Sequence, residues 1–163
     1  MQHNSRISIK EAKLKAASFC AYRERTQQEL REKLYDLGLY SEEVEEVIAY
    51  MITNNFLNEE RFAKAYAGGK FRINNWGKAK ILHHLKLKGL SPYCIKEGLK
   101  EIDQEDYIEK LDSLILKRKG VNNKEDEYLW KRKIANHLIS KGFESEIVWE
   151  RVNKISQFDE FDH

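Results

Sequence analysis

Ten lysine and arginine side chains are concentrated in residues 61–100, where the only acid is Glu97. This segment, the basic middle, carries a net charge of +9, between −3 for residues 1–60 and −4 for residues 101–163. A single lysine is best explained as part of a solvated helix face, but nine net charges without neighbouring acids indicate a binding surface. Such a surface suits phosphate groups or the carboxylates of an acidic protein, and charge alone does not decide between them.

Aromatic rings are interleaved with these cations at two places. The first is Lys70-Phe71-Arg72, and the second is Trp76 with Lys78 and Lys80. Each of these cations can meet a phosphate or a carboxylate, so the two places are the candidate centre of the binding surface.

The sequence offers no comparable signal for catalysis. It lacks a phosphate-binding glycine loop, a metalloprotease helix motif and paired cysteine ligands. His83 and His84 are adjacent, so on a helix they point about 100° apart and cannot both face one metal ion. Cys94 can approach only one of them, and a lone Cys–His pair is a weak signal. We therefore expect a protein that is not an enzyme and that uses neither a metal nor a cofactor.

The cysteines and the hydropathy pattern indicate the compartment. Cys20 and Cys94 are isolated in helical stretches, as expected for buried thiols in a reducing environment. No apolar run reaches the roughly 18 residues of a membrane span. Residues 1–8 contain no apolar core of a signal peptide. The sequence thus predicts a cytoplasmic protein without a membrane partner.

The elements that position the basic middle follow a pattern that occurs three times. Each copy is centred on a glycine, with apolar residues at fixed offsets on both sides, and the three glycines lie at similar intervals along the chain. The glycines are Gly38, Gly89 and Gly142. Apolar residues four apart before the glycine form one stripe of a helix, and a second stripe follows it. This regularity is typical of a helical repeat array.

Turn residues separate the helices of each copy. A glycine permits the left-handed turn that ends the first helix. Ser41, Ser91 and Ser145 follow as expected N-caps of the second helix. The pattern predicts nine helices, near residues 9–24, 27–37, 42–53, 59–73, 78–88, 92–101, 104–118, 125–141 and 146–156.

These helices predict a domain organisation in four parts. The parts are an N-terminal helix at 1–25, repeat 1 at 26–75, repeat 2 at 76–121 and repeat 3 at 122–163. Repeat 3 is short, because too few residues follow its second helix for a full third one.

Three motifs in order resemble the signatures of the bacterial RecX family. They are Arg23-Glu24-Arg25-Thr26 with Glu29-Leu30, Leu34 and Gly38; Leu57-Asn58-Glu59-Glu60-Arg61-Phe62-Ala63; and Gly77-Lys78 with Leu85 and Lys88-Gly89. The similarity extends from about Lys15 to Ile155. Any one motif is weak, but the ordered set is fairly specific. Asn58 and Thr26 depart from the aspartate and serine common in the family, and both keep the capping chemistry.

The resemblance implies an all-α fold of tandem three-helix repeats, similar to helix-turn-helix units, in an elongated curved array. It also implies a cytoplasmic regulator, usually an inhibitor, of the recombinase RecA. The family is pictured as lodging in the helical groove of the RecA–DNA filament. There it would block strand exchange, ATP hydrolysis and filament growth, and so restrain DNA recombination, DNA repair and the SOS response.

On this interpretation the basic middle faces the filament and its DNA. The residues that we expect to bind are Arg23, Arg25, Lys70, Arg72, Lys78, Lys80, Lys86 and Lys88. The expected partner is the RecA filament, with weak contact to single- or double-stranded DNA, and the chain is expected to be a monomer. Two alternatives stay open: a stand-alone helical nucleic-acid-binding module, and a helical scaffold for an acidic protein partner.

Overall fold

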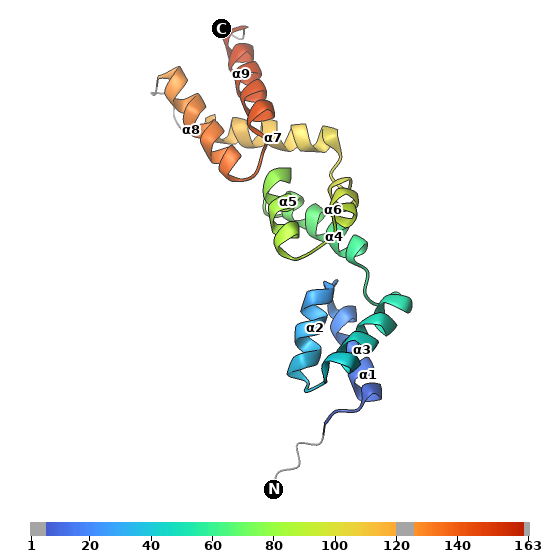
Figure 1. Cartoon of the computed structure of the whole chain (residues 1–163). Coiled ribbons are helices and arrows are strands. Elements are labelled where there is room, and N and C mark those ends of the chain that lie inside the picture. The colour runs from blue at the N-terminus through green and yellow to red at the C-terminus, as the bar shows by residue number, and fades with distance from the viewer. Residues whose placement is uncertain (1–5, 120–125, 162–163) are drawn as a thin grey trace. The chain divides into compact units, whose positions relative to one another are not determined.

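The computed structural model describes residues 6–119 and 126–161, with side chains up to Ser156. These residues form nine α-helices and no strand (Figure 1). The helices are α1 (Ile9–Tyr22), α2 (Gln27–Asp36), α3 (Ser41–Thr53), α4 (Glu59–Arg72), α5 (Lys78–Leu87), α6 (Pro92–Leu99), α7 (Gln104–Lys119), α8 (Glu127–Ser140) and α9 (Ser145–Phe161). Each lies where the sequence predicts a helix, so the all-α fold is confirmed for the described residues.

The ends of the elements differ from the prediction at the C-terminal side. The pattern predicts an end near residue 156, but α9 continues to Phe161, since residues 157–161 contain no glycine or proline to interrupt it. The expected boundary between repeats 2 and 3, at 121/122, lies outside the described residues. The other expected domain boundaries, at residues 26 and 76, stay predictions.

The three repeat glycines end their helices as predicted. Gly38, Gly89 and Gly142 have φ angles of 91°, 80° and 102°, in the left-handed region that glycine adopts at little cost. In two copies the amide after the glycine reaches back to the last helical turn: Leu39 N–H donates to Leu34 and Phe143 N–H to Leu138. The apolar residue after the glycine is thereby turned into the core, where Leu39 and Phe143 are buried.

The helix starts match the prediction in some copies and not in others. The Ser91 hydroxyl accepts from the backbone N–H of Cys94 at 3.2 Å, as an N-cap does. The predicted caps Ser41 and Ser145 are wrong, because each is the first residue of its helix. At α3 the Glu43 carboxylate instead accepts from the Tyr40 backbone N–H at 3.1 Å, so the helix starts one residue earlier.

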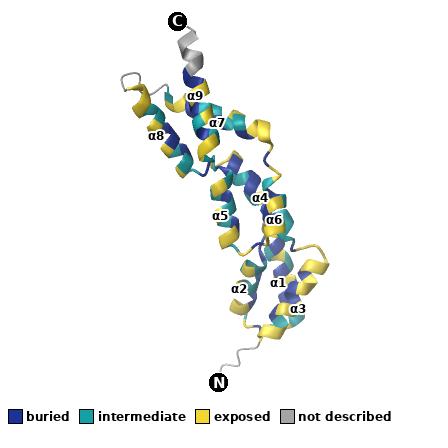
Figure 2. Ribbon diagram, turned by 45° about the horizontal axis from the view of Figure 1, so that its top comes forward, coloured by how far each residue is buried: buried dark blue, intermediate teal, exposed yellow. Residues whose placement is uncertain are grey.

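The chain forms two compact units. Unit 1 comprises Met1–Ala65 and Lys86–Gly98, and unit 2 comprises Tyr66–Leu85 and Leu99–His163. Within each unit the helices are buried on one side and exposed on the other (Figure 2). In unit 1, α1 packs against α2 and α3. Buried alanines on α1, Ala12 and Ala16, allow α1 to pack closely in this core.

Arg61 links the separate parts of unit 1. Its guanidinium Nε donates to the Glu24 carboxylate at 2.5 Å, and its Nη2 donates to the backbone carbonyls of both Asn55 and Phe56. The neighbouring Glu59 carboxylate accepts from the Gln27 backbone N–H at 3.2 Å, which caps the start of α2. The first turn of α4 therefore holds both the α1–α2 junction and the turn before α4.

In unit 2, the start of α5 lies directly against the turn before α9. The Gly77 N–H donates to the Lys141 carbonyl at 2.8 Å, and the Ala79 N–H donates to the Gly142 carbonyl at 2.9 Å. A Cβ on Gly77 would lie 2.2 Å from the Gly142 carbonyl carbon. Only a glycine fits at residue 77 without displacing this backbone.

A buried tyrosine completes the same contact. Tyr107 of α7 is fully buried, and its hydroxyl donates to the Glu144 carboxylate at 2.8 Å and accepts from the Lys78 backbone N–H at 3.0 Å. Its ring packs between Phe71 and Phe143, at centroid distances of 5.8 and 5.2 Å. Burial is the main cause that raises the Tyr107 pKa, so the phenol stays protonated and can donate.

We expect Gly77→Ala to destabilise the protein by about 1–3 kcal/mol or more, because the new methyl group meets backbone that cannot move as a side chain does. The matched control is Gly69→Ala. Gly69 lies inside helix α4, and a Cβ there would meet no neighbouring atom within 4 Å. That change should stabilise by roughly 0.5–1 kcal/mol. Urea denaturation of both variants measures the difference, and equal stabilities would contradict the close contact.

We expect Tyr107→Phe to lower the free energy of unfolding by about 1–3 kcal/mol, since the Lys78 amide and the Glu144 carboxylate each lose a buried partner. The control is Tyr128→Phe, which alters an exposed ring and should change stability by less than about 0.5 kcal/mol. Thermal unfolding followed by circular dichroism measures both. A Tyr107→Phe protein as stable as its parent would show that the hydroxyl has no structural role.

Candidate functional site

The structure divides the eight predicted binding residues between the two units. Unit 1 holds Arg23, Arg25, Lys86 and Lys88, whereas unit 2 holds Lys70, Arg72, Lys78 and Lys80. The four in unit 2 lie on the last turn of α4 and the first turn of α5, on either side of the Asn74–Gly77 turn. We therefore describe unit 2 first.

Trp76 is the centre of the unit 2 group. The Lys80 and Lys70 ammonium nitrogens lie 4.4 and 4.9 Å from the centroid of its ring. The Trp76 backbone N–H donates to the Lys70 carbonyl at 3.1 Å, after Asn75 turns the chain with a φ of 58°. Cation–π attraction stabilises an ammonium group that lies over an indole ring. Lys70 from α4 and Lys80 from α5 therefore both lie beside the one half-buried ring of Trp76.

Two further rings complete this cluster. The Tyr66 ring lies edge-on to the Trp76 ring, with the two centroids 6.5 Å apart. The His84 ring centroid lies 4.7 Å from the Trp76 ring centroid. We call Tyr66, Lys70, Trp76, Lys80 and His84 the tryptophan cluster. Aromatic faces with ammonium groups beside them are the parts that nucleic-acid-binding surfaces use, rings for bases and cations for phosphates.

Lys78, predicted as a binding residue, instead makes contacts within unit 2. Its backbone N–H is bound by the Tyr107 hydroxyl, and its ammonium group donates to the Gln104 side chain at 3.1 Å. The same ammonium nitrogen lies 4.6 Å from the centroid of the Tyr107 ring. Lys78 is thus already engaged with α7.

The structure adds a cation that the sequence analysis missed. The Lys110 ammonium group donates to the Arg72 carbonyl at 3.3 Å and to the Asn75 side chain at 3.0 Å, and it lies 5.5 Å from the Phe71 ring centroid. Lys110 belongs to the net acidic segment 101–163, so a charge count along the chain conceals it. The orphan carbonyls at the end of α4 are the only sequence signal that such a partner is required.

Arg25 is committed to the packing of unit 1. Its side chain is buried, its Nε donates to the Phe19 carbonyl at 2.9 Å, and its guanidinium carbon lies 3.7 Å from the Phe19 ring centroid. Burial lowers the Arg25 pKa, with the positive charge of Arg23 as a further cause. Arg23 itself is more exposed, and its guanidinium lies 3.5 Å from the Glu29 carboxylate.

The other two unit 1 residues lie around the end of α5. Lys86 is exposed, whereas Lys88 is half-buried with its ammonium nitrogen 5.9 Å from the centroid of the Phe62 ring. In unit 2, the side chain of Arg72 is exposed as well. Lys86 and Arg72 are therefore the two predicted lysine or arginine residues of the basic middle with the most accessible side chains.

The described residues offer little for catalysis. Among them, no group of three histidine, cysteine or acidic side chains is arranged to hold a metal ion. Burial raises the pKa of the Cys20 thiol, which keeps it protonated and unreactive at neutral pH.

Among the helices of the described residues, none combines the length and the apolar character that crossing a bilayer requires.

Sequence models of one protein family match the chain at three places. They are described as the first, second and third three-helix domains of RecX, and they match residues 12–51, 58–99 and 104–152. These ranges fall on α1–α3, α4–α6 and α7–α9.

Individual relatives carry the same family name. Regulatory protein RecX of Clostridioides difficile (strain 630) is 30% identical over 154 residues, which cover 93% of this chain and 71% of that protein. Its namesake from Clostridium botulinum (strain Alaska E43) is 31% identical, covering 85% and 65%. The Bacillus cytotoxicus protein is 28% identical, covering 86% and 52%. This chain therefore spans about half to two thirds of the length of several relatives.

Solved structures agree on the fold. The crystal structure of RecX from Lactobacillus salivarius superimposes with a TM-score of 0.84 and 21% identity, over 91% of this chain and 97% of that one. A second crystal structure, of a regulatory protein RecX, gives a TM-score of 0.74 and 23% identity, over 89% and 74%.

The relatives are named as regulatory proteins and not as enzymes. With three matched domains, and with 30% identity over nearly the whole chain to one of these proteins, the chain belongs to the RecX family of regulatory proteins.

Proposed function

We propose that this protein binds the RecA–DNA filament in the cytoplasm and inhibits the recombinase, thereby restraining DNA recombination, DNA repair and the SOS response. The observation that carries the proposal is the tryptophan cluster with its lysines, in a chain of the RecX family. A filament presents DNA phosphates and protein carboxylates together, and cations beside aromatic rings suit both.

The proposed mechanism is occupancy, without chemistry on a substrate. The tandem helical repeats would lie along the filament groove and contact several RecA subunits. Bound there, it would hinder the strand exchange and ATP hydrolysis that require the groove to be open. Because each exposed charge contributes only about 0.2–1 kcal/mol, several cations must act together. The protein would act as a monomer.

The eight predicted residues have different roles in this proposal. Lys70, Arg72, Lys80 and Lys86 provide accessible or partly accessible charge and are the proposed contacts. Arg23 and Lys88 are secondary contacts. Arg25 and Lys78 have a structural role, since their side chains are engaged in contacts within their own units.

A stand-alone nucleic-acid-binding module is the second candidate function. It is favoured by one observation, the half-buried Trp76 ring with two ammonium groups beside it. Stacking of a base on an aromatic side chain contributes roughly 1–3 kcal/mol without sequence preference. Tight DNA binding in the absence of recombinase, with a steep dependence on salt, would favour this candidate.

The test of the proposed function is ATP hydrolysis by a cognate RecA on single-stranded DNA, with this protein titrated in. We expect inhibition, and its stoichiometry distinguishes two modes. Inhibition at substoichiometric ratios would indicate capping or disassembly of filaments, whereas inhibition only near saturation would indicate occupancy of the groove. No effect at low salt would contradict the proposal and favour the nucleic-acid-binding module.

The contact residues are tested in the same assay with the triple variant Lys70→Glu, Arg72→Glu, Lys80→Glu. We expect the concentration for half inhibition to rise by about tenfold or more, because three favourable charges become repulsive. The matched control makes the same charge change at exposed residues elsewhere: Lys10→Glu, Lys117→Glu, Arg132→Glu. The control should stay within about threefold of the parent protein. Equal inhibition by the triple variant and its parent would overturn the assignment of these residues.

A further inference from the structure

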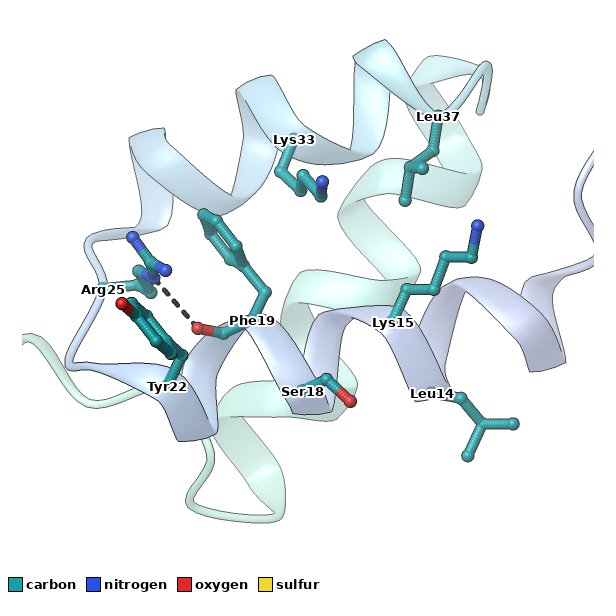
Figure 3. Close-up of a pocket in the computed structure, with 8 residues that line it drawn as sticks. All are labelled: Leu14, Lys15, Ser18, Phe19, Tyr22, Arg25, Lys33 and Leu37. Carbon is teal, nitrogen blue, oxygen red and sulfur yellow. Dashed lines mark hydrogen bonds between the residues drawn. The ribbon is translucent and has the colours of Figure 1, made fainter.

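A second surface suited to binding lies in unit 1, and of the eight residues considered above only Arg25 lines it. It is an open groove of about 490 Å³ between α1 and α2 (Figure 3). Its lining residues are Leu14, Lys15, Ser18, Phe19, Tyr22, Arg25, Lys33 and Leu37. The lining contains three cations and four apolar or aromatic side chains, but no acid.

The apolar part of the groove is accessible. Leu14 is 65% exposed and Tyr22 is 84% exposed, so a ligand can reach both side chains. Phe19 and Leu37 form the half-buried floor between the two helices. Arg25 closes one end, held to the Phe19 carbonyl by the hydrogen bond drawn in Figure 3. The floor is thus fixed in place by contacts that a ligand would not have to form.

The other end of the groove carries unpaired charge. Lys15 of α1 and Lys33 of α2 both reach toward the gap beside Leu37 (Figure 3). Neither ammonium group has a carboxylate within ion-pair distance among the described residues, although Glu11 and Glu29 each lie one helical turn earlier. The Lys33 ammonium nitrogen lies 5.8 Å from the centroid of the Phe19 ring.

This positive groove is unexpected in a segment with a net charge of −3. Four acids of unit 1 are paired with arginines outside the groove or at its closed end, which contributes to the positive lining. These pairs are Glu24 with Arg61, Glu29 with Arg23, Glu43 with Arg6 and Glu45 with Arg31. These four carboxylates are engaged away from the open end of the groove, and within the described part of the chain neither Lys15 nor Lys33 has a carboxylate partner.

We propose that this groove binds an acidic peptide segment of a partner protein. An aromatic side chain of the peptide packs on Phe19 and Leu37, while its carboxylates lie between Lys15 and Lys33. A purely apolar ligand would leave both ammonium groups without a counter-charge, and a purely acidic one would leave the floor exposed to water. The occupant must combine both chemistries. The proposal does not depend on the filament function.

The experiment measures fluorescence anisotropy of a labelled peptide in which one tryptophan precedes three aspartates, flanked by glycine and serine. The full chain is titrated in at low salt, without DNA or recombinase. We expect saturable binding that weakens by about tenfold or more in the Lys15→Glu, Lys33→Glu variant. Peptides with asparagine for aspartate, or serine for tryptophan, should bind correspondingly weakly.

The matched control is the Lys10→Glu, Lys13→Glu variant. It makes the same change in charge, with both residues on α1, and these two residues line a different depression, with Tyr50 and Phe56. Its affinity should stay within about twofold of the parent protein. Both pairs of lysines are largely outside the core, and circular dichroism of each variant confirms that it is folded.

Three outcomes would overturn the proposal. The first is the absence of saturable binding, and the second is equal weakening in the two double variants, which would indicate only general charge attraction. The third is self-association of the chain that rises with concentration and disappears in the Lys15→Glu, Lys33→Glu variant. That result would assign the groove to a second copy of this chain.

Discussion

The backbone contact between residues 77–79 and residues 141–142 determines where the candidate site lies in unit 2. Two hydrogen bonds join the start of α5 to the turn before α9, and the absence of a side chain at Gly77 permits the approach. Tyr107 bridges the same place through the Lys78 amide and the Glu144 carboxylate. Trp76 immediately precedes this anchored point and Lys80 follows it. The cluster that we propose as a binding surface is therefore attached to backbone that these hydrogen bonds hold in place.

The cations of the chain have two kinds of role, and burial separates them. Lys70 and Lys80 lie over an aromatic ring while their ammonium groups stay near solvent, so packing and binding are compatible. The Arg25 side chain is buried against the ring and the backbone carbonyl of Phe19, and a ligand would have to displace these contacts to pair with its full charge. A count of charges along the sequence treats these residues alike, although the free energy needed to make each charge available to a ligand differs.

The helices could be predicted from the sequence because their signals are local. Glycine at the left-handed turn and apolar residues four apart specify helix ends and faces within one repeat. The contacts of Gly77, Lys110 and Arg61 could not, since each depends on a partner more than thirty residues away in the chain. The predicted N-cap at Ser41 was wrong for a local reason. A serine and a following acid both favour the start of a helix, and here the Glu43 carboxylate accepts from the Tyr40 N–H, so that Tyr40 is the N-cap. The family motifs, and not these physical signals, indicated the regulatory family.

The discontinuity of unit 1 has a consequence for the order of folding during synthesis. This unit is made of Met1–Ala65 and Lys86–Gly98, so the ribosome must complete α6 before the unit has all its parts. Gly98 lies so close to Ala63 that a Cβ would approach the Ala63 methyl group to 2.6 Å, and this contact can form only at that late stage. Closing a chain segment of this length carries only a modest entropic penalty. A nascent chain released before residue 98 would expose the surface of α4 that Gly98 normally covers, which makes premature termination there a source of aggregation.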